Sequence, residues 1–103
     1  MICGSISHSQ ASSDRVSALV KECTTDQRVC EEYLLGVWDS GLMLQDLNHY
    51  STVVFCTKVG PTGEELRSAF QKWAIDADPK VLERSPRVVG AILALKHAFA
   101  CKQ

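Results

Sequence analysis

Four of the five cysteines lie at the edges of stretches with helical periodicity, and they constrain the fold more than any other feature. They are Cys23, Cys30, Cys56 and Cys101. The set is even and contains no Cys-x-x-Cys pair. Small exported domains use such cysteines as disulfides when their hydrophobic core alone gives marginal stability. We therefore expect a disulfide-stapled domain that works outside the cytosol.

Size and composition indicate one folded domain. The chain has 103 residues, of which 46% are hydrophobic and 22% charged, which is too apolar for a disordered chain. The net charge of −1 and the scattered Lys and Arg residues give no basic field for nucleic acid. The apolar runs are far shorter than the roughly 20 residues that cross a bilayer. We expect neither nucleic-acid binding nor membrane insertion.

The first twelve residues differ from the rest of the chain. They are small and polar, they carry no carboxylate, and Ser9-Gln10-Ala11 resembles the end of a secretory leader. We interpret residues 1–12 as a leader remnant or a disordered tail, and residues 13–103 as a single helical domain. Cys3 is then not expected to take part in the disulfides of the domain.

Apolar residues recur every three to four positions in four stretches, which predicts helices. These stretches cover residues 13–23, about 25–46, about 62–77 and 85–101. A loop is expected at residues 48–61 and a charged connector after Asp78-Pro79. The fold class is therefore predicted to be all-α, a small disulfide-stapled bundle of four to five helices. The predicted buried faces are Val16, Leu19, Val20 and Cys23; Val29, Tyr33, Leu34, Val37, Trp38 and Leu42; Leu66, Ala69, Phe70, Trp73, Ala74 and Ala77; and Val88, Val89, Ile92, Leu93, Leu95 and Phe99.

Three sequence signals predict where these helices begin. Thr24 and Thr25 are expected to cap the second helix, with Gln27 completing a capping box, and Thr62 with Glu65 forms the same pattern before the third. The dipeptide Ser85-Pro86 is expected to start the last helix, since proline loses no hydrogen bond in a first turn. Inside the second helix, Gly36 and Gly41 are interpreted as sites where another backbone approaches closely.

Helix lengths limit how the cysteines can pair. Helices joined by short connectors are expected to be antiparallel, and a helix over residues 25–46 spans about 30 Å. Bonded cysteines have Cα atoms about 4.4–6.8 Å apart, so Cys30 cannot easily reach Cys56. We predict the pairs Cys23–Cys30 and Cys56–Cys101. The alternatives are a zinc site, which lacks closely paired ligands, and a catalytic pair of Cys56 with His97.

Four motifs resemble those of the type VI secretion amidase immunity proteins. They are Cys30-Glu-Glu-Tyr-Leu-Leu-Gly-Val-Trp-Asp39, Phe55-Cys56, Gly60-Pro-Thr-Gly-Glu-Glu-Leu66 and Ala98-Phe-Ala-Cys101. The chain departs from this pattern at Lys58 and Ala100, where proline is frequent. The resemblance implies a small helical periplasmic protein without catalytic activity, cofactor or metal. Such a protein binds and inhibits a peptidoglycan amidase effector, and it is expected to form a homodimer.

The resemblance also implies a target for inhibition, a groove with a Cys-His pair that accepts an anionic peptide. Two polar segments could enter such a groove, the loop at residues 48–52 and the connector at residues 76–84; both could equally be solvated links. The predicted effector-binding residues are Asn48, His49, Tyr50, Ser51, Asp76, Asp78, Lys80, Glu83 and Arg84. Trp38 and Trp73 are assigned to the core, although tryptophan is also enriched at binding hot spots. His97 is assigned to a structural role at a helix end.

Two other functions compete with immunity. A periplasmic acid-stress chaperone is also a small helical disulfide protein, and it would protect client proteins at low pH. An enzyme has less support, because the sequence carries no metal motif, phosphate-binding loop or convincing pair of catalytic carboxylates.

Overall fold

A computed structural model describes residues 14–47 and 60–99, with side chains described as far as residue 42 in the first range. These residues form five helices: α2 (Val16–Thr25), α3 (Gln27–Leu47), α4 (Gly63–Asp76), α5 (Pro79–Arg84) and α6 (Arg87–Phe99). No strand occurs in the two ranges, so the all-α prediction is confirmed. The expected tail at residues 1–12, the predicted loop at residues 48–52 and the predicted bond Cys56–Cys101 lie outside the described residues.

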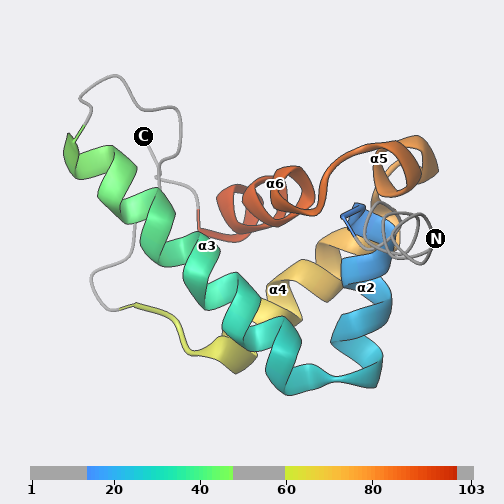
Figure 1. Ribbon diagram of the computed structural model, residues 1–103, viewed down its shortest axis with the longest axis horizontal. Helices are drawn as coiled ribbons and strands as arrows, with labels where there is room; N and C mark the ends of the chain where they lie inside the picture. The colour runs from blue at the N-terminus through green and yellow to red at the C-terminus, as the bar shows by residue number, and fades with distance from the viewer. Residues whose placement is uncertain (1–13, 48–59, 100–103) are drawn as a thin grey trace, which may run out of the picture.

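The long helix α3 forms one side of the molecule, and α4 crosses it instead of running antiparallel to it (Figure 1). Helix α2 packs against α3, α4, α5 and α6. One hydrophobic core joins these elements, and its fully buried side chains come from α2, α3, α4 and α6. They are Val16, Leu19, Cys23, Cys30, Leu34, Leu66, Phe70, Ala91, Ala94 and Leu95. None of the described helices is both long enough and apolar enough to span a membrane.

Helix α6 packs through its small residues. Gly90, Ala91, Ala94 and Leu95 are its buried residues. The predicted buried face is wrong for Val88, Val89 and Leu93, which are 42%, 39% and 44% exposed. On α3, Val29 and Leu42 were likewise expected in the core and are exposed. Close approach at the small residues leaves Val88, Val89 and Leu93 on the outside, whereas Leu95 reaches the core.

The starts of α2 and α6 are joined by a short extended pairing. The Val16 amide donates to the Ser85 carbonyl at 3.0 Å, and the Arg87 amide donates to the Asp14 carbonyl at 2.6 Å. Pro86 lies in this bridge, one residue before the helix that it was predicted to start. The pairing fixes the register in which α6 lies against α2.

The two predicted capping boxes have different outcomes. At α4 the box is confirmed, because the Glu65 amide donates to Thr62 Oγ1 at 3.1 Å and the Thr62 amide donates to Glu65 Oε1 at 2.8 Å. The box at Thr24 is wrong. The Thr24 and Thr25 hydroxyls donate back to the Lys21 carbonyl, at 2.7 and 3.0 Å, and so belong to the last turn of α2.

The residue that separates α2 from α3 is Asp26. Its carboxylate accepts the Val29 amide at 3.3 Å, as an N-cap side chain does. The hydroxyl of a threonine in a helix can donate to the carbonyl three or four residues earlier. Thr24 and Thr25 make this hydrogen bond and therefore do not cap α3.

The expectation that Gly36 admits a neighbouring backbone is wrong for the described part of the chain. Gly36 is exposed, and a Cβ atom built there would have nothing within 4 Å. Gly41 is buried. A neighbouring element does approach closely at Gly90, where a Cβ would lie 2.6 Å from Val16 Cγ1.

Candidate functional site

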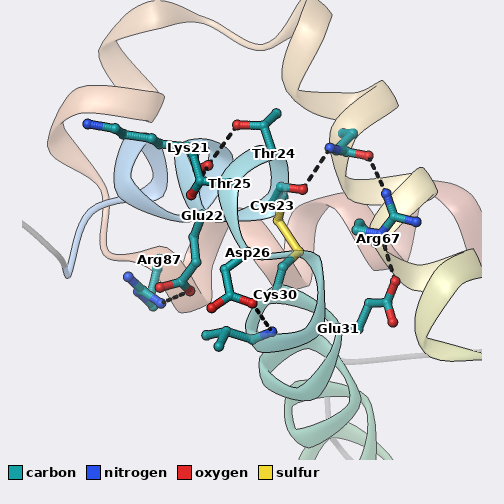
Figure 2. Close-up of a disulfide and its surroundings, with 12 residues drawn as sticks. Lys21, Glu22, Cys23, Thr24, Thr25, Asp26, Cys30, Glu31, Arg67 and Arg87 are labelled. Atoms are coloured by element: carbon teal, nitrogen blue, oxygen red, sulfur yellow. Dashed lines mark hydrogen bonds and ion pairs between the residues drawn. A yellow bond between two sulfur atoms is a disulfide. The ribbon is translucent and has the colours of Figure 1, made fainter.

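The predicted disulfide between Cys23 and Cys30 is confirmed, and it links the end of α2 to the first turn of α3 (Figure 2). The two Cα atoms lie 4.9 Å apart, and both side chains are fully buried. The two cysteines are seven positions apart in the sequence, and the loop between them contains the Asp26 cap. The bond therefore fixes the corner where the chain reverses.

Helix α4 is tied to this corner by polar contacts. Arg67 Nε donates to Glu31 Oε2 at 2.7 Å, and this ion pair is partly shielded from solvent (Figure 2). Gln71 Nε2 donates to the carbonyl of Cys23 at 3.2 Å. The Arg67 guanidinium also approaches Gln71 Oε1 at 3.5 Å. Contacts from two successive turns of α4 therefore hold that helix against both ends of the disulfide loop.

On another side of the corner, Arg87 connects α6 to α2 and α3. Its Nη1 donates to Glu22 Oε1 at 3.2 Å, and its guanidinium carbon lies 5.2 Å from the centre of the Tyr33 ring. Burial raises the pKa of the Tyr33 phenol above 10.0; Arg87 opposes the shift, and the negative charges of Asp14 and Glu22 add to it. Tyr33 is therefore an uncharged contact at neutral pH.

The charged connector predicted at residues 76–84 contains the short helix α5. Asp78 is the N-cap of α5 and accepts the Lys80 amide at 2.9 Å, and Pro79 follows at the first position. Lys80, Glu83 and Arg84 are exposed on α5. The carbonyl of Arg84 accepts a hydrogen bond from Arg15 Nη1 at 2.7 Å.

The other predicted site residues divide into two groups. Asn48, His49, Tyr50 and Ser51 lie outside the described residues. Asp76 lies at the end of α4, apart from α5, and it lines a surface hollow together with His97 of α6.

This hollow, which we call the Trp73 hollow, lies between α4 and α6 and has a volume of about 660 Å³. Trp73 is half-buried in its wall, and its ring centre lies 5.9 Å from that of the fully buried Phe70. The charged and polar side chains around it are exposed. Its lining residues are Ser68, Ala69, Lys72, Trp73, Asp76, Ala77, His97 and Ala98.

A second depression, the α3–α6 groove, is more apolar and has a volume of about 460 Å³. It runs past the exposed Gly36 and is walled on the α6 side by Val88 and Ile92. Its lining residues are Glu32, Tyr33, Gly36, Val37, Ser40, Gly41, Val88 and Ile92. Sequence reasoning missed both depressions, because it assigned Trp73 and Val88 to the core.

Within residues 14–47 and 60–99, no group of three or more His, Cys, Asp or Glu side chains is placed to hold a metal ion. The fold and its surfaces define a class of protein: a small helical domain, closed by a buried disulfide, that offers shallow surfaces lined by aromatic, aliphatic and charged side chains. Such surfaces are typical of proteins that bind other proteins.

Residues 15–101 match the Rap1a immunity proteins, and the chain belongs to this family. The family consists of immunity proteins for type VI secretion effectors, so the family resemblance of the four motifs is confirmed. Comparison with curated proteins and with solved structures gave no significant match.

Proposed function

We propose that this protein is the immunity partner of a type VI secreted peptidoglycan amidase. It binds the amidase, obstructs the groove that holds the catalytic Cys-His pair, and carries out no chemistry of its own. The observation that carries the proposal is the family match over residues 15–101. That match favours immunity over the chaperone and enzyme alternatives.

The proposed compartment is the periplasm, where the amidase would meet its cell-wall substrate. The buried Cys23–Cys30 disulfide supports this assignment, because structural disulfides form and persist in oxidising compartments and are rare in the cytosol. The disulfide also makes the junction of α2 and α3 rigid, which suits an inhibitor. A rigid surface loses less conformational entropy on binding than a mobile one does.

Residues from both predicted segments remain candidates for entering the groove. Asn48, His49, Tyr50 and Ser51 form the first candidate plug. In the second segment, the Asp78 carboxylate already serves as a cap, which leaves Asp76, Lys80, Glu83 and Arg84 with exposed side chains for contact.

We also propose that the protein acts as a homodimer through the α3–α6 groove. The groove is mostly apolar, and the exposed Val88 lines it. The same helix also exposes Val89 and Leu93. Homodimer interfaces are more apolar than contacts between independently soluble partners. Sedimentation of Ser40→Arg, which puts a charge into the groove from an exposed position, should give a monomer where the parent gives a dimer.

Co-expression tests the proposed function directly. A candidate peptidoglycan amidase effector, sought among the genes next to this one, is directed to the periplasm of a host, with and without this protein. Immunity predicts rescue from lysis and co-purification of the two proteins at neutral pH. Continued lysis with both proteins present in the periplasm would contradict it, and protection of unrelated client proteins at low pH would support the chaperone alternative.

A further inference from the structure

We propose that the Trp73 hollow is the surface on which the effector docks. It would receive an apolar or aromatic effector side chain against Trp73 and an effector carboxylate at Lys72 and His97. This inference rests on the proposed immunity function and assigns a surface to it. The surface is separate from the apolar α3–α6 groove.

Trp73 has the placement of a binding hot spot. It lies half-buried in the wall of the hollow, and the fully buried Phe70 supports its ring. A ring held by the core loses little conformational freedom when a partner covers it. Tryptophan dominates binding energy at interfaces when a surrounding rim of residues excludes water from it.

The rim of the hollow carries polar groups that the fold does not use. Among the described residues, Ser68, Lys72, Asp76 and His97 make no hydrogen bond or ion pair with one another or with any other side chain. Lys72 and Asp76 are four residues apart on α4, a spacing at which opposite charges can pair. Their charges are instead available to a partner.

The donors in this rim outnumber the carboxylates. Lys72 carries a full positive charge, and His97 and Ser68 add donors from α6 and α4, whereas Asp76 is the one carboxylate that lines the hollow. An approaching carboxylate would therefore find three donors on two helices. Charge complementarity of this kind sets specificity and the rate of association.

The Trp73 hollow and the α3–α6 groove have different linings, which favour different binding partners. A rim of charges around one aromatic residue is typical of contacts between proteins that are each soluble alone, whereas a mostly apolar lining is typical of a dimer contact. An effector and its inhibitor are made and folded separately. The Trp73 hollow fits that kind of partner.

Three exposed positions give matched variants for the test. Ser68→Arg fills the hollow, and Lys72→Glu reverses a charge on its rim. Lys21→Glu makes the same charge reversal on α2, away from the lining of the hollow and outside both candidate plug segments. The probe is the purified amidase that this protein rescues in the co-expression test, with affinity measured by calorimetry and folding checked by thermal melting of each variant.

We expect Ser68→Arg and Lys72→Glu to weaken binding by about tenfold or more, a size typical of changes at hot spots, while Lys21→Glu binds like the parent. Parent-like affinity of both hollow variants would overturn the assignment and leave the immunity function standing. If the unmodified protein does not bind the amidase, the immunity function fails and this docking surface fails with it.

A second readout does not depend on any hollow variant. The chain has two tryptophans, Trp38 in the core and Trp73 at the hollow. Incorporation of 5-fluorotryptophan gives one ¹⁹F resonance for each, and Trp38→Phe assigns them. The Trp73 resonance should shift when the amidase is added, whereas an unchanged Trp73 resonance in a formed complex would contradict the proposal.

Discussion

Gly90 of α6 lies against Val16 of α2 so closely that a Cβ atom at position 90 would be 2.6 Å from Val16 Cγ1 and 2.8 Å from Cγ2. Val16 is fully buried, and its amide is held by the Ser85 carbonyl. The valine therefore has little room to move away. This contact sets the distance between α2 and α6, and it determines that α6 buries its small residues.

Two glycine substitutions should have opposite effects on stability. Gly90→Ala is expected to lower the free energy of unfolding by about 1–3 kcal/mol, the usual cost of overpacking a core. Gly36→Ala should raise it by up to about 1 kcal/mol, because alanine is the better helix former and a Cβ there meets no atom within 4 Å. Denaturant unfolding of the two variants measures both effects, and destabilisation of similar size in both would contradict the packing described here.

Cap substitutions should distinguish the three candidate N-caps. Thr62→Ala and Asp26→Ala are each expected to cost about 1 kcal/mol, because each removes the acceptor for a free amide of a first turn. Thr24→Ala should cost less, since its hydroxyl bonds an exposed carbonyl at the end of α2. A larger loss of unfolding free energy for Thr24→Ala than for Asp26→Ala would instead support Thr24 as the cap, as predicted from sequence.

Removal of the short disulfide should weaken the fold without abolishing it. The loop-entropy relation gives about 2.5 kcal/mol for a loop of this length, so the double variant Cys23→Ser, Cys30→Ser should unfold at a lower denaturant concentration. Peptide mapping of the unreduced parent should recover the Cys23 and Cys30 peptides joined. An unchanged unfolding midpoint in the double variant would show that the bond adds no stability.

Alkaline pH should destabilise the protein through Tyr33. Burial raises its pKa in the folded state above 10.0, so the folded state favours the neutral phenol. The stability that this provides is complete below about pH 10 and is lost as the pH rises through the folded-state pKa. Tyr33→Phe should unfold with a weaker dependence on pH above that point, and an unchanged dependence would contradict this role of Tyr33.

Sequence reasoning succeeded where the signal is local. The Thr62–Glu65 box and the Cys23–Cys30 bond each depend on residues no more than seven positions apart, and both are confirmed. The helix content followed from periodicity in the same way. At Thr24, however, two local hydrogen-bonding patterns competed, and the hydroxyl bonds the preceding turn.

The candidate surfaces could not be predicted from periodicity, because they depend on how helices pair. Val88 and Val89 are apolar and have helical spacing, but both are exposed. The residues that α6 buries are Gly90, Ala91, Ala94 and Leu95. Trp73 was assigned to the core, yet it faces a hollow that exists only because α4 and α6 meet there. Asp76 was selected as a polar residue near a turn, and its partner in that hollow, His97, is 21 positions away in the sequence.

Inhibition of the amidase is the most direct test of the proposed function. Purified amidase hydrolyses isolated peptidoglycan while increasing amounts of the oxidised protein are added, and a thiol-directed label reports access to the catalytic cysteine. Obstruction of the groove predicts that hydrolysis and labelling both fall to background once the protein is in stoichiometric amount. Undiminished hydrolysis at a large excess of this protein would contradict it.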